Sequence, residues 1–222
     1  MCNISGIVFG VKSMRAVDVK GCRVLEVGSK DVNGGLKLVV QSWEPGEYVG
    51  VDIENGPGVD RICAVEDLVE EFGAGSFDIV IATELLEHVR NWRTAITNMK
   101  EVCKPGGTML ITTRSYGFPY HGYPADFWRF ELNDVRTIFS DCAILALERD
   151  PESPGVFVKV KKPEQFIAGS LEVHELYSIV VGRRVREVTA RDLRSFHFRR
   201  LVSRERLRWY LHSAVDRLFS RL

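Results

Sequence analysis

Short apolar runs recur along the first 160 residues of the chain, separated by polar, glycine-rich or proline-rich stretches. Continuous apolar runs of this length are typical of strands that are buried on both faces of a parallel sheet. Seven runs are predicted as strands, over residues 23–27, 48–53, 59–64, 77–82, 108–113, 143–147 and 156–160.

Helical patterns lie between these strands. Apolar residues at near-helical spacing predict a helix over residues 85–103, which ends at the Lys-Pro-Gly-Gly sequence that follows. Weaker patterns predict a short helix within residues 3–20, packed on the sheet edge, and another over residues 66–72. Asn133 is a good N-cap for a helix that runs to Phe139.

Strands that alternate with helices at this spacing predict an α/β fold. The last two strands are joined by a short link, so they are expected to form an antiparallel pair. We therefore predict a doubly wound, mostly parallel seven-stranded sheet with an antiparallel last strand, helices on both faces and a C-terminal helical extension. Ligands of such sheets bind beyond the carboxyl ends of the strands.

The pattern changes after residue 162. Residues 1–162 are predicted to form one domain and residues 163–222 a basic, helical C-terminal extension, within which residues 164–182 fit a helix or a strand. The predicted final helix has an apolar face at Leu207, Leu211, Ala214, Val215, Leu218 and Leu222. Such a face packs on the body or in a homodimer, or else the basic helix lies on anionic lipid or contacts nucleic acid.

Composition agrees with one globular domain. The 222 residues are 45% hydrophobic, enough for a sizeable core. Thirty basic residues balance thirty acidic ones, but residues 183–222 carry a formal charge of +8 and the remainder −8. The five cysteines are scattered and no histidine has a metal-ligand spacing, so no metal site is predicted. The absence of a leader and of an apolar run of roughly 18 residues predicts a cytoplasmic protein.

A glycine-rich turn follows the first strand and is the first sign of a nucleotide site. Gly28 ends the strand and Gly34 and Gly35 close the turn, where glycine permits close approach of a ligand and positive φ angles. Asp52 is the last polar residue of the second strand, 24 positions after Gly28, where an acidic residue is placed to accept hydrogen bonds from both hydroxyls of a ribose. The alternative is that Asp52 caps the loop of residues 54–58.

Further segments complete a resemblance to the class I S-adenosylmethionine-dependent methyltransferases. The matching segments, in the family's order, are residues 24–28, Asp52, residues 77–80, residues 84–89 and residues 104–107. The resemblance covers about residues 21–162 and implies S-adenosylmethionine as the cofactor. Together with the glycine turn, the pattern His121-x-x-Pro124-x-Asp126-x-Trp128-Arg129-Phe130 resembles a bacterial subgroup associated with glycan and secondary-metabolite pathways, which implies a small-molecule or glycan acceptor.

The resemblance also implies which residues hold the cofactor. The glycine turn passes the methionine part, Asp52 holds the ribose and Ile53 packs on the adenine. Two positions depart from the family pattern: Lys30 replaces a usual glycine, and Ala64 replaces an acidic residue that often binds the adenine amino group. Adenine recognition is therefore expected from the chain near Val65 and Glu66. The implied cofactor residues are Glu26, Gly28, Ser29, Asn33, Gly34, Asp52, Ile53, Val65, Glu66, Thr83 and Glu84.

Methyl transfer to a hydroxyl needs alignment and a base that removes the proton. His121 is the first candidate, because it titrates in the useful range and lies on a loop expected to cover the pocket. Asp126 and His88 are the other candidate catalytic residues. The candidate substrate-binding residues are Glu87, Tyr123, Trp128 and Arg129.

Each of these residues also has a structural alternative. His121 and the loop aromatics serve equally well as the loop's own small core, and Arg129 pairs equally well with Asp126. Glu87 at a helix N-terminus favours the macrodipole. Neighbours on a helix point about 100° apart, so Glu87 and His88 are not expected to face the substrate together.

The resulting functional prediction is a methyltransferase that acts on a small-molecule or glycan acceptor, at an oxygen. A catalytically silent binding protein with the same fold is one alternative, because Lys30 and Ala64 depart from the family pattern. A methyltransferase that reaches a macromolecule through the basic extension is another. A nicotinamide dehydrogenase fits less well, since the expected Gly-x-Gly-x-x-Gly is missing.

Overall fold

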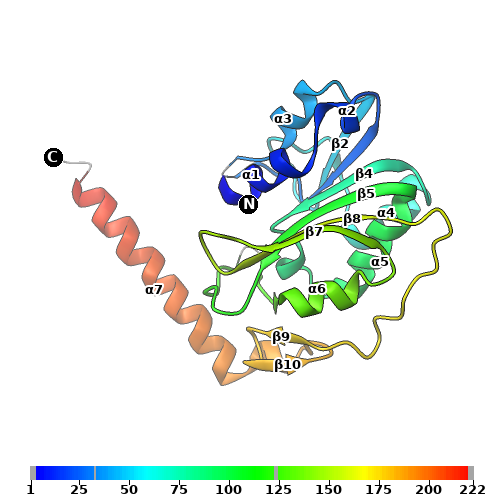
Figure 1. Cartoon of the computed structure of the whole chain (residues 1–222). Coiled ribbons are helices and arrows are strands. Elements are labelled where there is room, and N and C mark those ends of the chain that lie inside the picture. Colours follow the sequence, from blue (N-terminus) through cyan, green and yellow to red (C-terminus); the bar gives the residue numbers. More distant parts are fainter. Residues whose placement is uncertain (1–3, 33, 123–124, 220–222) are drawn as a thin grey trace.

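A single seven-stranded sheet lies at the centre of the computed structural model, in the order β3-β2-β1-β4-β5-β8-β7 (Figure 1). The structure describes residues 4–32, 34–122 and 125–219, with only the backbone of Trp209 and of residues 211–219. The strands of this sheet are β1 (Arg23–Val27), β2 (Glu47–Asp52), β3 (Arg61–Ile62), β4 (Phe77–Thr83), β5 (Cys103–Arg114), β7 (Ala143–Arg149) and β8 (Gly155–Lys161).

The strand directions confirm the predicted sheet. The first five strands run parallel, whereas β8 pairs antiparallel with both β5 and β7. The edge strand β3 is shorter than the predicted 59–64. The Val59 N–H closes a turn onto the Gly56 carbonyl at 3.2 Å, and a 3-10 turn, η1 (Val65–Asp67), follows directly after Ala64.

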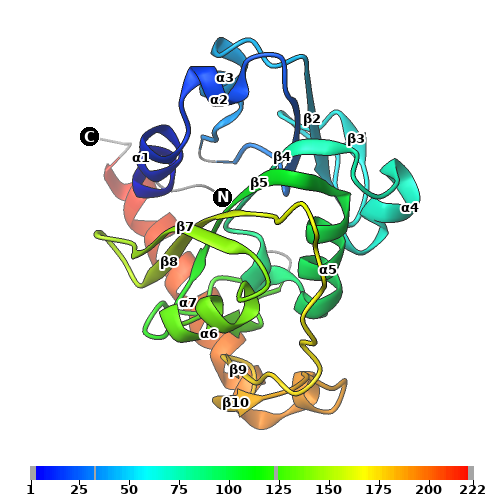
Figure 2. The same ribbon diagram turned by 45° about the vertical axis from the view of Figure 1, so that its right-hand side comes forward.

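Helices cover both faces of the sheet, as predicted (Figure 2). One face carries α1 (Ile4–Ser13), α2 (Ala16–Val19) and α3 (Lys37–Ser42), whose apolar residues form a core with β1, β4, β5 and β8. The other carries α4 (Leu68–Phe72), α5 (Trp92–Val102) and α6 (Leu132–Ile138) over a larger core. The α1 helix lies on the face of the sheet rather than at its edge, since the Phe9 ring packs 5.2 Å from that of Phe157 on β8.

The helix predicted over residues 85–103 is interrupted. It begins as a 3-10 turn, η2 (Leu86–His88), and the α-helix starts only at Trp92. Tertiary partners take up the carbonyls between them: Trp128 Nε1 lies 3.1 Å from the carbonyl oxygens of both Val89 and Arg90, and the Phe127 N–H donates to the Glu87 carbonyl at 2.8 Å. A continuous helix would need those carbonyls for its own N–H groups.

The N-cap of α6 is also different from the prediction. The helix begins at Leu132, so Asn133 lies in its first turn and Glu131 occupies the N-cap position. The Glu131 N–H donates to Asp134 Oδ2 at 3.0 Å. Asp134, three positions after the cap, therefore binds back to the N–H of the cap residue, as in a capping box.

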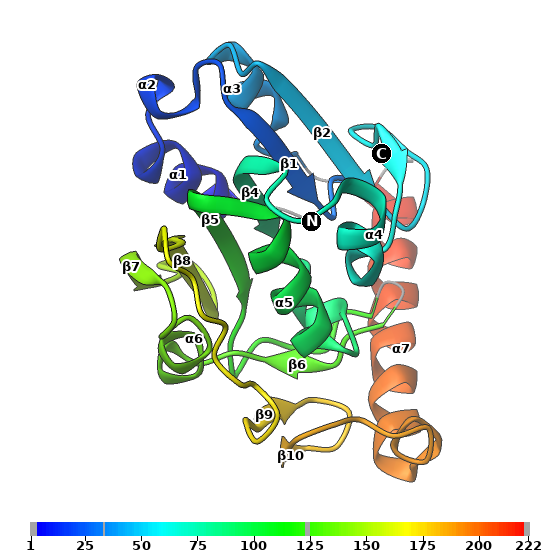
Figure 3. The same cartoon turned by 90° about the vertical axis from the view of Figure 1, so that its right-hand side faces the viewer.

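A second, three-stranded sheet joins the C-terminal segment to the rest of the chain. Its order is β10-β9-β6, from β6 (Trp128–Arg129), β9 (Leu176–Ser178) and β10 (Arg183–Val185), all antiparallel (Figure 3). The stretch 164–182, which fitted a helix or a strand, therefore contributes a strand. Pairing between β6 and β9 connects residues that lie about fifty positions apart in the sequence.

The chain ends with a 3-10 turn, η3 (Asp192–Arg194), and a long helix, α7 (Phe196–Phe219), which leaves the body in Figure 1. Its first half contacts the loop that precedes β6: the rings of Phe198 and Tyr120 lie 5.8 Å apart. Of the predicted apolar face, Leu207 is exposed, and the side chains from Leu211 onward lie outside the described residues. Within the described part of the chain, every helix is too short or too polar to cross a membrane.

Candidate functional site

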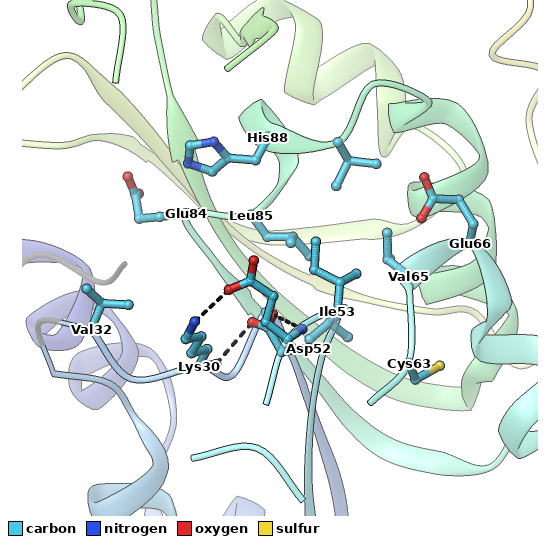
Figure 4. A pocket seen from close by; sticks show the side chains of 14 residues that line it. Lys30, Val32, Asp52, Ile53, Cys63, Val65, Glu66, Glu84, Leu85 and His88 are labelled. Carbon is cyan, nitrogen blue, oxygen red and sulfur yellow. Dashed lines mark hydrogen bonds and ion pairs between the residues drawn. The ribbon is translucent and has the colours of Figure 1, made fainter. Parts of the chain in front are cut away.

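A pocket opens at the carboxyl ends of β1, β2 and β4, where the fold predicts a ligand (Figure 4). One wall carries Lys30 and Asp52, and the opposite wall carries Glu84 and His88. The lining residues are Val27, Gly28, Lys30, Val32, Asp52, Ile53, Glu54, Cys63, Val65, Glu66, Glu84, Leu85, His88 and Val89.

The glycine turn forms the floor of this pocket. Gly28 has a φ of 75°, and a Cβ at that position would lie 3.0 Å from Leu85 Cδ1. The N–H groups of Gly28 and Ser29 both donate to the Val51 carbonyl, at 2.9 and 3.0 Å, which holds the turn against β2. Glycine is favoured here because the positive φ strains any other residue and a Cβ would crowd the Leu85 side chain.

Lys30, the departure from the family pattern, is tied to the second strand. Its N–H donates to Asp52 Oδ2 at 3.2 Å, and its Nζ lies 2.6 Å from Glu54 Oε2. The Glu54 N–H donates to Asp52 Oδ1 at 3.1 Å. Two backbone N–H groups therefore fix the Asp52 carboxylate at the pocket wall, with oxygen lone pairs available for ribose hydroxyls. This geometry fits the nucleoside part of S-adenosylmethionine.

Replacing Asp52 by alanine is expected to weaken binding of S-adenosylhomocysteine by about 1.5–3 kcal/mol, because a pair of charge-assisted hydrogen bonds is lost. Isothermal titration calorimetry measures this change. Asp18→Ala is the control, since Asp18 pairs with Arg15 on the surface. A dissociation constant that is the same in Asp52→Ala and the unmodified protein would contradict the ribose contact.

The part of the pocket where adenine was expected is lined by Ile53, Cys63, Val65 and Glu66. Ile53 is 55% exposed, which leaves an apolar surface free for a ring. The side-chain amide of Asn98 donates to the carbonyls of Val65 and Glu66. Residues 65 and 66, which were expected to recognise the adenine in place of an acidic residue at Ala64, are therefore fixed by a side chain from α5.

The opposite wall begins with Glu84, a non-glycine residue with a φ of 53°. Such a conformation costs of order 1–3 kcal/mol, and residues that adopt it cluster at functional sites. The buried carboxylate accepts a hydrogen bond from Thr112 Oγ1 at 3.1 Å and forms an ion pair with Arg114. Burial and the neighbouring Glu87 raise the pKa of Glu84, and Arg114 opposes that shift.

Beyond Glu84, three polar side chains meet. The rings of His88 and His121 lie edge to face with centroids 4.8 Å apart, and Glu87 Oε1 lies 3.9 Å from His121 Nε2. The expectation that Glu87 and His88 do not face the substrate together agrees with the lining of the pocket, which includes His88 but not Glu87. The two residues belong to a 3-10 turn rather than an α-helix, and His121, from the loop before β6, approaches both side chains.

Asp126 contacts His121 of this group and is fully buried. Its Oδ2 accepts the His121 N–H at 3.0 Å and lies 2.9 Å from His121 Nδ1. Burial alone would raise the pKa of Asp126, but hydrogen bonds from Arg129 and His121 outweigh it and lower the pKa. The side chain is therefore a permanent carboxylate that positions His121 rather than a group that meets substrate.

Arg129 and Trp128 do not reach the pocket. Arg129 is 1% exposed and pairs with Asp126 at 2.5 and 2.7 Å, which is the structural alternative for this residue. Trp128 is fully buried with its indole N–H bonded to backbone carbonyls. The expectation that these two side chains bind substrate is therefore corrected, since both are used inside the fold.

Other expected residues also lie away from the lining. Glu26, Ser29, Gly34 and Thr83 are not among the lining residues, and Asn33 and Tyr123 lie outside the described residues. The sequence analysis did not identify the polar carboxyl end of β5. There Thr112 and Arg114 contact the carboxylate of Glu84, and Thr113 contacts that of Glu87. A polar triplet at the carboxyl end of an apolar strand was the available signal.

Glu26 lies beneath the turn and is expected to make stability depend on pH. Burial raises the pKa of its carboxyl to about 7, with Asp31 adding to the shift and the Tyr48 hydroxyl and Lys37 opposing it. The carboxyl therefore keeps its proton up to a higher pH in the folded chain than in the unfolded chain. The contribution of Glu26 to the free energy of unfolding is therefore fully present below pH about 4.5. It falls by about 3 kcal/mol as the pH rises through 7.

Urea unfolding of Glu26→Gln and the unmodified protein at pH 5 and pH 8 checks this expectation. The Gln variant should lose less stability between the two pH values, because its side chain does not ionise. An equal loss of stability in both proteins would show that a group other than Glu26 causes the pH dependence.

Comparisons with known proteins agree with this geometry. Residues 10–150 match the model of a methyltransferase domain. The chain is 34% identical over 113 residues to a ubiquinone biosynthesis O-methyltransferase of Dechloromonas aromatica, covering 45% of this chain and 47% of that protein. It is 43% identical over 112 residues to the mitochondrial enzyme of the same name from Rattus norvegicus, covering 43% and 31%. The chain thus spans less than half the length of these curated relatives.

Solved structures share the fold. A 1,6-didemethyltoxoflavin-N1-methyltransferase from Burkholderia thailandensis, with S-adenosylhomocysteine bound, superposes with a TM-score of 0.54 at 14% identity, covering 72% of this chain and 76% of that one. An S-adenosylmethionine-dependent methyltransferase from Mesorhizobium loti gives 0.53 at 15% identity, covering 68% and 94%. With the family match over most of the sheet and the pocket at its carboxyl edge, the chain belongs to the class I S-adenosylmethionine-dependent methyltransferases.

Proposed function

We propose that this protein transfers a methyl group from S-adenosylmethionine to a hydroxyl oxygen of a small molecule. The observation that carries the proposal is the pocket itself, which has the Asp52 carboxylate on one wall and His88, with the buried polar group behind it, on the other. The names of the curated relatives refer to O-methylation in ubiquinone biosynthesis, which supports oxygen as the acceptor atom and a small molecule as the substrate. None of these names refers to a glycan.

The cofactor supplies an electrophilic methyl on a sulfonium, so the chain has to align the acceptor and dispose of one proton. The aligning walls come from rigid elements, since Glu84 and Leu85 follow β4 directly and the glycine turn follows β1. Alignment of two reactants contributes roughly 7–11 kcal/mol to such a step. The acceptor hydroxyl loses its proton at the group formed by Glu87, His88 and His121, with Asp126 holding His121 in orientation.

The test is transfer of a labelled methyl group from S-adenosylmethionine to a panel of hydroxylated and dihydroxylated aromatic compounds, followed by mass spectrometry. We expect one added methyl on oxygen. Binding of S-adenosylmethionine without transfer to any acceptor would favour the silent binding protein, and a lack of binding would overturn both. The test is needed because the [4+2]-cyclase SpnF has the same fold, with a TM-score of 0.56 at 15% identity, covering 74% of this chain and 81% of that one.

A further inference from the structure

The C-terminal extension, residues 163–222, lies beyond the part of the chain that matches the methyltransferase domain. It nevertheless contacts the two segments that carry the histidines of the site, η2 and the loop before β6. Arg90, two positions after η2, donates to the Val188 carbonyl at 2.6 Å, and the Ile179 N–H donates to the Phe127 carbonyl at 3.0 Å. The extension is therefore packed against this wall of the site.

The helix α7 of the extension adds a contact directly beside His121 (Figure 3). The Gly122 N–H, one residue after His121, donates to Glu205 Oε2 at 3.3 Å. The Glu205 side chain is half-buried at this contact. Burial raises the pKa of Glu205, and the Gly122 N–H and the charge of His121 oppose that shift. A carboxylate of α7 therefore acts on the residue that is proposed to take the proton.

An aromatic contact joins the same two elements. The ring of Tyr120 lies edge to face with that of Phe198 on α7, with centroids 5.8 Å apart. Gly122 leaves room for this arrangement, because a Cβ at that position would overlap the Tyr120 ring. Phe198 also packs against the main core, whereas Phe196 in the same turn is 81% exposed. The start of α7 is thus anchored on the body at the place where it meets the loop.

The backbone of residues 118–122 is consequently held from two directions. From the domain, Arg129 donates to two carbonyls of this segment, and Asp126 accepts the N–H of His121. From the extension, Glu205 accepts the next N–H along the chain. A group that takes a proton in the transition state has to be placed closely, since an error of about 1 Å can cost roughly 10²-fold in rate.

We propose that Glu205 is a positioning residue for the methyl transfer, which holds residues 118–122 so that His121 meets the acceptor hydroxyl. The extension then completes the acceptor side of the site, and the domain alone provides the cofactor pocket, whose lining residues all precede residue 90. Glu205 acts through Gly122 and His121 and touches neither cofactor nor acceptor. This inference rests on the proposed methyl transfer and gives the extension a part in it.

Hydrogen exchange of the peptide that contains residues 118–122, followed by mass spectrometry, tests the contact without any turnover. We expect exchange to be about 2–10-fold faster in Glu205→Ala, because one hydrogen bond is lost. Glu205→Gln should exchange like the unmodified protein, since its amide oxygen still accepts the Gly122 N–H. His197→Ala is the matched control, since His197 is exposed on the same helix. Unchanged exchange in Glu205→Ala would overturn the proposal.

Methyl transfer to a dihydroxylated aromatic compound gives the second readout. In Glu205→Ala we expect turnover to fall by up to about 10²-fold and the ratio of isomeric products to change, with the dissociation constant for S-adenosylhomocysteine unaltered. Glu205→Gln should restore both turnover and product ratio. A lower melting temperature with unchanged turnover and product ratio would show a merely structural contact and overturn the positioning role.

The two readouts also separate this inference from the proposed function. If the unmodified protein methylates no hydroxyl compound but Glu205→Ala still exchanges faster, the methyl transfer is overturned and the hold of α7 on residues 118–122 is supported. If the unmodified protein transfers methyl groups and Glu205→Ala transfers them equally well to the same oxygen, the positioning role is overturned and the methyltransferase proposal is unaffected.

Discussion

Replacing Arg129 by methionine is expected to lower the free energy of unfolding by about 3–5 kcal/mol, because the change leaves the buried Asp126 carboxylate without its partner. Arg129 is 1% exposed and binds Asp126 through both terminal nitrogens, at 2.5 and 2.7 Å. It also donates to the carbonyls of Phe118 at 3.1 Å and Pro119 at 2.9 Å, so the same change frees the loop that carries His121.

Urea unfolding measures this loss, and Arg149→Met is the matched control. Arg149 is exposed and lies 3.9 Å from Glu131, so its loss should cost at most about 1 kcal/mol. A protein with Arg129→Met that unfolds like the unmodified one, but binds acceptor poorly, would restore the expectation from the sequence that Arg129 contacts substrate.

His121→Ala is expected to lower the turnover number by about 10²–10⁴-fold, the usual contribution of a group that handles a proton in the transition state. The dissociation constant for S-adenosylhomocysteine should stay unchanged, because His121 is not among the residues that line the cofactor pocket. The proposed role of His121 in removing the proton acts on the acceptor rather than on the cofactor.

The measurements are turnover with saturating acceptor, cofactor affinity by calorimetry and the melting temperature. His197→Ala again serves as the control, with turnover expected to match the unmodified protein. A melting temperature that falls in proportion to activity would show that His121 belongs to the small core of its loop, where its ring lies edge to face with Phe118 at 4.9 Å.

The sequence determined the main sheet and one wall of the pocket. Buried parallel strands are encoded by continuous apolar runs, so the seven strands and their antiparallel member could be located from local composition. Gly28 and Asp52 were also accessible to sequence reasoning, because a turn and the residue that ends the neighbouring strand have a fixed spacing in this fold.

Only the tertiary structure decided the opposite wall. The interruption of the predicted helix after His88 depends on Trp128 and Phe127, which bind backbone carbonyls that a continuous helix would use. No local sequence pattern encodes a partner about forty positions away. For the same reason the polar pattern around residue 126 could not distinguish a buried Asp126–Arg129 pair from a substrate contact. The approach of His121 to Glu87 and His88 depends on loop closure between two distant segments, which the helical periodicity of either segment does not encode.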